Sequence, residues 1–452
     1  MKHDILRLLA SITLFIQLGL AVAAQSTSNT LDSTKQDSIA TLAIKQFVDR
    51  PEPAHAWSHI GSHKNAYGTI HQLRVTSQVW NDKKWEHAVE VYEPIQTTHR
   101  KHALLFVTGG SQLGEPSRSE IERGLTLANQ CGAAVIMLHQ VPNQPLLDGR
   151  KEDDLISETW LRYLETGDPN WPLLFPMVKS AVKTLDSIET FSEKHLGNKI
   201  DKFVITGASK RGWTSWLTPV VDTRIIATAP IVIDVLNFRE QMKHQLDSWG
   251  EYSLQIRDYT SKGLVKGVQE IESPRETQLR TMMDPFSYRD QLSLPKLLIV
   301  GTNDPYWTVD AMNLYWDDLI GPKFISQHPN AGHGLEGSQK QAMQTLAVFF
   351  QHVAANRPLP EIDWKPIETA STIGLQITCD MKPQEVKLWY ANSEDGDFRD
   401  DRWNYIQSTL SNGQWLGQIK KNAVGQQAVF AEIQFSTDDL TWSLTSLVHR
   451  FK

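Results

Sequence analysis

Residues 202–213 read Lys-Phe-Val-Ile-Thr-Gly-Ala-Ser-Lys-Arg-Gly-Trp, and this stretch decides the fold. The apolar residues near its start predict a buried strand, and Gly207 and Ala208 then introduce Ser209 at the start of a helix. A turn that exposes one side chain between a strand and a helix holds that residue in strained backbone geometry, so small neighbours are needed beside it. The pattern predicts that Ser209 is an exposed nucleophile, although a serine that only caps a helix fits the same local sequence.

Two later segments supply the groups that such a serine needs. A serine hydroxyl is a poor nucleophile unless an imidazole takes its proton and an acid orients that imidazole. The predicted strand at 296–301 is followed by Asp304, and His333 lies in a small-residue loop after a further short strand at 323–327. Serine, acid and histidine in this order, each after a strand, is the chain order of the α/β-hydrolase triad. Ser209, Asp304 and His333 are therefore the predicted catalytic residues.

Two features around this triad have alternative interpretations. Asp234 ends the predicted strand that follows the serine, and it is the alternative acid because some hydrolases place the acid one strand earlier. The oxyanion hole of this fold takes one backbone N–H from the residue after the nucleophile and another from the loop after an early strand. Lys210 and Gly110 are predicted to supply these groups, although Gly109 and Gly110 also fit a plain turn.

An acidic segment follows another predicted strand. Residues 140–154 are predicted to form a long polar loop that leaves the sheet at the same edge as the nucleophile. A run of acids is usually a solvated face, but Glu152, Asp153 and Glu158 could instead hold a cationic group of a substrate, such as a free amine. Trp307 could line an apolar pocket near the site or pack in the core.

The order of the predicted elements indicates two domains after a signal peptide. Residues 1–24 have a basic start, an apolar run and a small-residue exit, so we predict an exported protein, periplasmic or secreted, with no further membrane span. Strand and helix patterns alternate over 25–357, which predicts a mostly parallel sheet with helices on both faces and a helical cap inserted at about 235–294. Residues 358–452 alternate with period two between Asn, Asp and Gly turns, which predicts an immunoglobulin-like β-sandwich.

Three further elements are predicted inside the first domain. The alternating runs at 70–80 and 85–92 predict an antiparallel hairpin at the edge of the sheet. Helical spacing over 176–195 predicts the helix that leads into the nucleophile strand, and a further helix is expected over 309–319.

Composition excludes several classes of function. The formal net charge of −7 gives no basic field, so nucleic acid is not an expected partner. Neither Cys-x-x-Cys nor His-Glu-x-x-His occurs in the sequence, and we expect no metal and no cofactor. The 2 cysteines, Cys131 and Cys379, could tie the two domains together as a disulfide or remain separate buried thiols.

Three segments carry a family resemblance: Gly207-Ala-Ser-Lys-Arg-Gly-Trp, Met283-Asp-Pro-Phe-Ser-Tyr-Arg-Asp-Gln-Leu-Ser-Leu-Pro-Lys and Gly301-Thr-Asn-Asp-Pro-Tyr-Trp. In them the chain resembles the PhoPQ-activated pathogenicity-related (PqaA-type) proteins. The resemblance implies a secreted α/β-hydrolase with the three predicted catalytic residues, and an association with bacterial envelope stress and virulence. The first segment is also similar to the nucleophile turn of some secreted aminopeptidase-type serine hydrolases, which often have glycine where this chain has Arg211.

Two functions fit these observations. The first is a serine hydrolase that cleaves an ester or amide bond of a small molecule or a peptide through an acyl-enzyme. The second is a non-catalytic binding or signalling protein built on the hydrolase scaffold. The presence of all three triad residue types in order favours the first, and the sequence leaves the oligomeric state open.

Overall fold

The structure is a computed structural model, and it describes residues 41–111, 118–437 and 439–451. The predicted signal peptide at 1–24 lies outside these described residues. Across the described ranges, none of the helices has both the length and the apolar character that crossing a bilayer requires.

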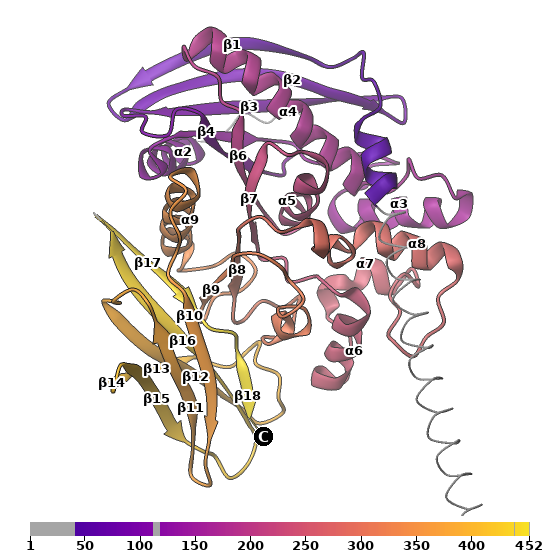
Figure 1. The fold of residues 1–452 in the computed structure, drawn as a ribbon. Helices are drawn as coiled ribbons and strands as arrows, with labels where there is room; N and C mark the ends of the chain where they lie inside the picture. The colour runs from indigo at the N-terminus through magenta and orange to yellow at the C-terminus, as the bar shows by residue number, and fades with distance from the viewer. Residues whose placement is uncertain (1–40, 112–117, 438, 452) are drawn as a thin grey trace, which may run out of the picture.

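A nine-stranded sheet forms the centre of the larger part of the molecule (Figure 1). Its strand order is β1-β2-β3-β5-β4-β6-β7-β8-β9. The first three strands are antiparallel, and the remaining six are parallel to one another. The strands are β1 (Ala56–Asn65), β2 (Gly68–Trp80), β3 (Lys83–Pro94), β4 (His102–Val107), β5 (Ala134–Leu138), β6 (Lys202–Ala208), β7 (Ile225–Ile231), β8 (Lys296–Gly301) and β9 (Lys323–His328).

The antiparallel edge of this sheet contains one strand more than the sequence analysis predicted. The predicted hairpin is confirmed as β2 and β3, in which Ile70 pairs with Tyr92. The strand β1 pairs with β2 on its outer side. Its residues are exposed or half-buried throughout, so its sequence lacks the apolar alternation that would have revealed it.

Helices cover both faces of the sheet (Figure 1). One face carries α4 (Leu174–His195) and α5 (Lys210–Val221), and the other carries α2 (Arg118–Cys131) and α9 (Gln339–Ala354). Adjacent strand residues therefore enter different cores, as Leu105 does on the first face and Leu104 on the second. Because both sides are buried, the central strands are continuous apolar runs, which made them easy to predict.

The segment between β7 and β8 is mostly helical, in agreement with the predicted cap. Its elements are α6 (Phe238–Trp249), η1 (Leu254–Ile256), α7 (Arg257–Thr260), α8 (Pro274–Met283) and η2 (Pro285–Gln291). The helix α8 begins with a reciprocal capping box, in which the Ser273 side chain accepts from the Glu276 backbone and the Glu276 side chain accepts from the Ser273 backbone.

The prediction of a helix over 309–319 is wrong. The structure has only a short 3-10 helix there, η3 (Ala311–Leu314), followed by turns. Contacts with distant parts of the chain hold this segment: the Asn313 side chain donates to the Val448 carbonyl at 2.9 Å, and the Tyr315 hydroxyl donates to Asp234. Tertiary contacts therefore override the local helical preference.

The C-terminal part consists of two antiparallel sheets, which agrees with the predicted β-sandwich. One sheet contains β10 (Ile362–Glu368), β11 (Thr372–Cys379), β15 (Gln414–Lys420) and β14 (Thr409–Ser411). The other contains β13 (Asn404–Gln407), β12 (Glu385–Ser393), β16 (Gln426–Thr437), β17 (Leu440–Thr445) and β18 (His449–Phe451). The strands β14 and β18 are only three residues long, and β10 is mostly exposed.

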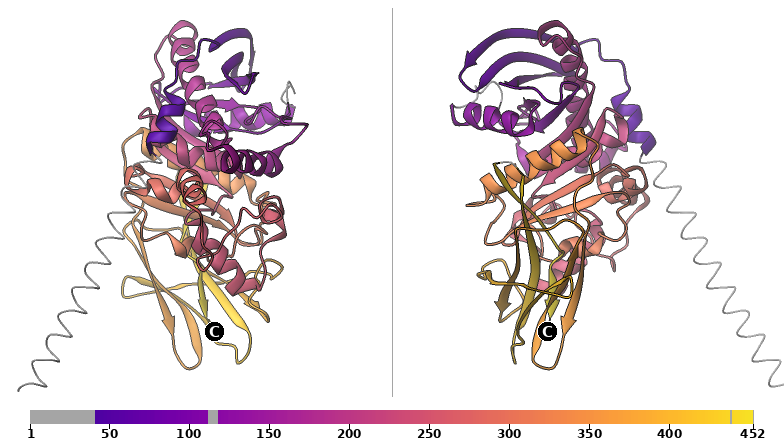
Figure 2. Two further views of the ribbon diagram at one scale, coloured as in Figure 1. Left: turned by 90° about the vertical axis from the view of Figure 1, so that its right-hand side faces the viewer. Right: turned by 60° about the vertical axis from the view of Figure 1, so that its left-hand side comes forward.

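The two parts of the molecule share a continuous apolar core. Figure 2 shows the C-terminal sheets at the opposite end of the molecule from β1–β3. One cluster of buried side chains includes Leu346 and Phe350 of α9 together with Leu375 and Ile433 of the two C-terminal sheets. The sandwich is therefore packed against the rest of the chain through α9.

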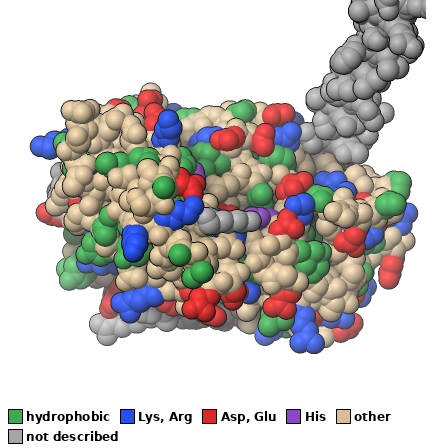
Figure 3. Space-filling view, turned by 90° about the horizontal axis from the view of Figure 1, so that it is seen from below, with side chains coloured by type: hydrophobic (Ala, Val, Ile, Leu, Met, Phe, Trp, Pro, Cys, Tyr) green, Lys and Arg blue, Asp and Glu red, His purple; other side chains and the backbone are tan. Residues whose placement is uncertain are grey.

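The surface carries charges of both signs. Figure 3 shows acidic and basic side chains interspersed over the face that it presents. This face has no extended field of one sign, of the kind that binding to a nucleic-acid backbone uses.

Candidate active site

Ser209 lies in a strained turn between β6 and α5. Its backbone has φ 56° and ψ −124°, a conformation that L-residues rarely adopt. The following helix packs closely on the strand. A Cβ added at Gly212 would lie only 2.8 Å from the Gly207 carbonyl oxygen. Glycine is therefore needed at 212, one place later than in the common Gly-x-Ser-x-Gly pattern.

The Ser209 hydroxyl forms a hydrogen bond with a histidine and does not cap the helix. In the described chain its side chain makes no capping hydrogen bond to α5. Instead, Nε2 of His333 lies 3.0 Å from Ser209 Oγ, and Nδ1 of the same ring lies 2.8 Å from Asp304 Oδ2. The structure thus brings the three predicted residues into one chain of hydrogen bonds with the geometry of a nucleophile, a base and an orienting acid.

Asp304, rather than Asp234, contacts the histidine. Its second oxygen accepts a hydrogen bond from the Tyr306 backbone at 2.9 Å, and the Tyr306 ring lies against His333 with 4.2 Å between ring centroids. Asp234 accepts a hydrogen bond from Tyr315, and its complete burial raises its pKa to about 7. The alternative acid is therefore held elsewhere in a site that favours its neutral form.

A segment of the C-terminal part holds the loops that carry the acid and the histidine. The side-chain nitrogen of Asn303, next to Asp304, lies 2.8 Å from the Arg399 carbonyl and 2.9 Å from the Asp401 carbonyl. The Asn330 side chain, in the loop before His333, donates to the Trp403 carbonyl at 3.0 Å and accepts from the Trp403 backbone at 2.8 Å. No local pattern indicates these contacts, because Asn303 and Arg399 are 96 residues apart and Asn330 and Trp403 are 73 residues apart.

The two predicted oxyanion groups lie at the same edge of the sheet. Lys210 is the first residue of α5, and the N–H groups of a first helical turn have no acceptor inside their helix. Gly110 follows β4, whose residue Val107 pairs with Gly207 at the end of β6. The space where a Gly110 side chain would extend is open in the described chain, and its φ of 112° favours glycine.

The predicted loop at 140–154 is a loop only as far as residue 151. Its last acids, Glu152, Asp153 and Asp154, form the first turn of α3 (Glu152–Thr166). Carboxylates in a first turn interact favourably with the helix dipole and the unpaired N–H groups. Acids at a helix start were the sequence signal available for this helix.

The carboxylates expected to hold a substrate ammonium are paired with cations of the chain itself. Arg211 donates to both oxygens of Glu152, each at 2.7 Å, and Lys210 Nζ lies 2.9 Å from Asp153 Oδ2. Glu158 lies 2.9 Å from Arg162. Each of these carboxylates therefore already has a cationic partner within the chain.

Arg211 joins the nucleophile turn to three neighbouring segments. Besides its bidentate contact with Glu152, its Nε donates to the Val141 carbonyl at 2.6 Å. Its guanidinium also packs against Gly109, where an added Cβ would lie 2.4 Å from Nη2. Burial opposes the ionisation of Glu152, but the hydrogen bonds and charge of Arg211 outweigh burial and lower the pKa of Glu152 to about 2.

Replacing Glu152 with glutamine is expected to lower the free energy of unfolding at pH 7 by about 1 kcal/mol, since the Arg211 contact loses its charge while the Glu152 side chain is 41% exposed. In the folded protein the pKa of Glu152 is below its ordinary value. The carboxylate therefore contributes fully to the free energy of unfolding above about pH 4.5, and this contribution disappears as the pH falls through about 2. Denaturant unfolding of both proteins at pH 7 and pH 3.5 checks this. An unchanged or wider stability difference at pH 3.5 contradicts it.

Neither a metal cluster nor a disulfide is formed by the described residues. They contain no group of three or more His, Cys, Asp or Glu side chains that could hold a metal ion. Cys131 is buried, Cys379 is half-buried, and both are free thiols. The two cysteines are therefore separate thiols, but only Cys131 is buried as predicted.

Trp307 lines a cavity that Ser209 and His333 also line. Asp153 and Lys210 contribute to the same wall, and Glu158 is not part of it. Tyr306, whose ring contacts His333, was not among the predicted site residues. Its position two residues after the predicted acid was the signal that could have found it.

A family model described as PhoPQ-activated pathogenicity-related protein matches residues 44–399. The chain belongs to this family. It is 33% identical over 384 residues to the autocrine proliferation repressor protein A of Dictyostelium discoideum, and the match covers 81% of this chain and 77% of that protein. The PhoPQ-activated pathogenicity-related family model thus covers most of the chain.

The fold is similar to that of a solved esterase. The acetyl xylan esterase from Paenibacillus sp. R4 superposes with a TM-score of 0.50 at 11% sequence identity, covering 70% of this chain and 94% of that chain. At this identity the likeness shows the α/β-hydrolase fold.

Proposed function

We propose that this protein is a serine hydrolase that cleaves an ester or amide bond through an acyl-enzyme. The observation that carries the proposal is the contact of His333 with both Ser209 Oγ and Asp304, at 3.0 and 2.8 Å. Ser209 would attack the carbonyl carbon while His333 takes its proton and then gives that proton to the leaving group. A water molecule, activated by the same imidazole, would release the acid and restore the serine.

The turn geometry supports a role in stabilising the oxyanion. The backbone N–H of Lys210 and a group near Gly110 are the proposed donors to the charge that develops on the carbonyl oxygen. The ion pairs of Lys210 and Arg211 with α3 keep this turn in place. They also leave no unpaired carboxylate at Glu152 and Asp153 for a peptide amine, so we favour an ester over an aminopeptidase substrate.

Two parts of the proposal rest on other grounds. Export rests on the signal-peptide pattern of residues 1–24, and a link to bacterial virulence or envelope stress rests on the family name. The second candidate function is a binding or signalling role on the same scaffold. The name of the Dictyostelium relative, a proliferation repressor, favours this candidate.

Labelling by an active-site-directed fluorophosphonate separates the two functions. A serine hydrolase is expected to be labelled, with the adduct on the peptide that contains Ser209, because only an activated serine attacks such a probe at a useful rate. Labelling is expected to disappear after heat denaturation. A folded protein that stays unlabelled supports the binding or signalling role.

A further inference from the structure

The cavity beside Ser209 extends away from the reacting groups into the cap. It has a volume of about 120 Å³. An apolar cavity of about 150 Å³ accepts a benzene molecule, so this space suits a group of about six carbons. The cap helices α6, α7 and α8 line it together with α3 and α5, so the cap forms part of its wall.

Aromatic rings form much of its wall. Trp160 of α3 lies edge-on to Trp213 of α5 with 5.8 Å between centroids, and Tyr259 lies 5.2 Å from Trp160. Two of these rings have partners for their polar atoms: the Trp213 N–H donates to the Met283 carbonyl at 2.7 Å, and the Tyr259 hydroxyl donates at 2.9 Å to Asp153, which also lines the cavity. The indole N–H of Trp160 is buried and has no hydrogen-bond partner among the described residues. The wall is therefore mostly carbon, with few polar atoms.

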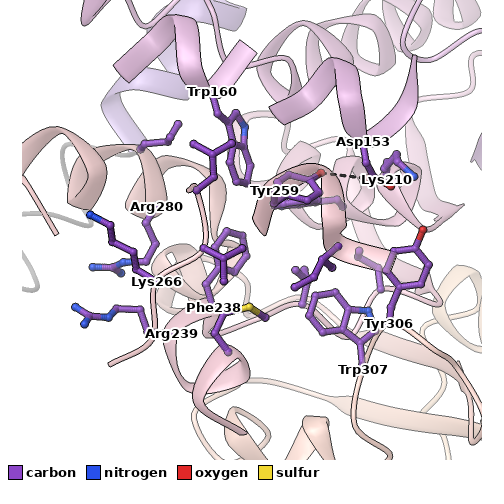
Figure 4. A pocket seen from close by; sticks show the side chains of 18 of the residues that line it. Asp153, Trp160, Lys210, Phe238, Arg239, Tyr259, Lys266, Arg280, Tyr306 and Trp307 are labelled. Atoms are coloured by element: carbon purple, nitrogen blue, oxygen red, sulfur yellow. Dashed lines mark hydrogen bonds and ion pairs between the residues drawn. The ribbon is translucent and has the colours of Figure 1, made fainter. Parts of the chain in front are cut away.

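Charged side chains occur at its two ends (Figure 4). Figure 4 shows Lys210, Asp153 and Tyr306 at one end, and Arg239, Lys266 and Arg280 at the other. The cations of the far end have partners within the chain, since Arg280 Nε lies 2.9 Å from Glu272 and Lys266 Nζ lies 2.7 Å from Glu276. Arg239 also pairs with Glu272, at 3.8 Å. An apolar stretch thus separates the reacting groups from a basic rim, in which three cations share two carboxylates.

We propose that this cavity binds an apolar group of about six carbons, attached directly to the scissile ester, so that the substrates are medium-chain or aryl esters rather than acetates. This inference rests on the proposed function of the same site. Each buried methylene strengthens binding about fourfold. The value of kcat/KM is therefore expected to rise on the order of 100-fold over four methylenes.

Two matched ester series test the proposal. One varies the acid, as p-nitrophenyl acetate, butyrate, hexanoate, octanoate and phenylacetate, and the other varies the alcohol, as methyl, butyl, hexyl and octyl acetate. We expect kcat/KM to peak near six carbons in one of the two series, which also tells which side of the ester enters the cavity. Flat values in both series, with hydrolysis still dependent on Ser209, overturn this inference and leave the proposed function standing.

Variants of the cavity provide the second test. Val265 lines the cavity, and Val265→Trp is expected to fill it and to lower the hexyl-to-acetyl ratio of kcat/KM by roughly tenfold. The matched control is Leu254→Trp, because Leu254 belongs to the same cap but is 74% exposed and does not line the cavity. If Val265→Trp does not fold, Leu264→Phe makes the same test. An unchanged ratio in a folded cavity variant contradicts the proposal.

A binding measurement tests the cavity without relying on hydrolysis. Ser209→Ala protein is titrated calorimetrically with methyl hexanoate, hexyl acetate, methyl acetate and monomethyl adipate. At least one of the two six-carbon esters is expected to bind at least about tenfold more tightly than methyl acetate, and this preference is expected to be lost with Val265→Trp. Preference for adipate over hexanoate shows that the basic rim binds an anion and overturns the apolar assignment.

Discussion

Ser209→Ala is expected to lower kcat/KM for a p-nitrophenyl ester by on the order of 10⁴-fold or more, because the variant keeps the oxyanion groups but has no nucleophile. The hydroxyl makes its hydrogen bond to His333 and caps nothing in the described chain, so the melting temperature should stay nearly unchanged. Initial rates and thermal unfolding of the purified protein measure both effects.

The matched control for this variant is Ser338→Ala. Ser338 also precedes a helix and likewise makes no capping hydrogen bond with its side chain. Its replacement is expected to leave the rate within about twofold, as is usual for a surface change outside a site. Equal activity in the Ser209 variant and the control would remove Ser209 from the mechanism.

The second large effect is expected at the acid. Asp304→Asn should lower kcat by about 10⁴-fold at pH 8, because an amide permits the wrong imidazole tautomer and cannot stabilise the imidazolium. The fold should survive, since asparagine can still accept the hydrogen bond from the Tyr306 backbone. The rate is compared with that of Asp234→Asn on the same ester.

Asp234→Asn is expected to change kcat by less than about tenfold. Asp234 makes its hydrogen bond with Tyr315 and does not contact His333, and asparagine can still accept from Tyr315. A larger loss in Asp234→Asn than in Asp304→Asn assigns the orienting role to Asp234 and contradicts the contact seen at His333.

The sequence predicted best those features that depend on short stretches of chain. The strand at 202–208 and its neighbours are continuous apolar runs, because helices bury both of their faces. The order of Ser209, Asp304 and His333 along these strands was enough to bring them together, because parallel strands present their carboxyl ends at one edge.

Features that depend on pairing between distant residues were not predictable in the same way. The acids at the start of α3 looked like a solvated loop or an amine site, since nothing local reveals that Arg211 and Lys210 are their partners. The expected helix over 309–319 was wrong for a similar reason: contacts such as that of Asn313 with Val448 determine the conformation there.

The hydrogen bonds between the C-terminal part and the loops of Asp304 and His333 determine when the protein can become active. Ser209 and its helix are synthesised well before the C-terminal part. The Asn303 side chain can make its hydrogen bonds only after the carbonyl groups at 398–401, some 95 residues later, have been synthesised. A ribosome-bound or proteolytically shortened chain that ends before this segment contains the nucleophile without the support for its acid and base loops. We therefore expect competence for hydrolysis to arise as a last step of maturation, so that incomplete chains remain inert.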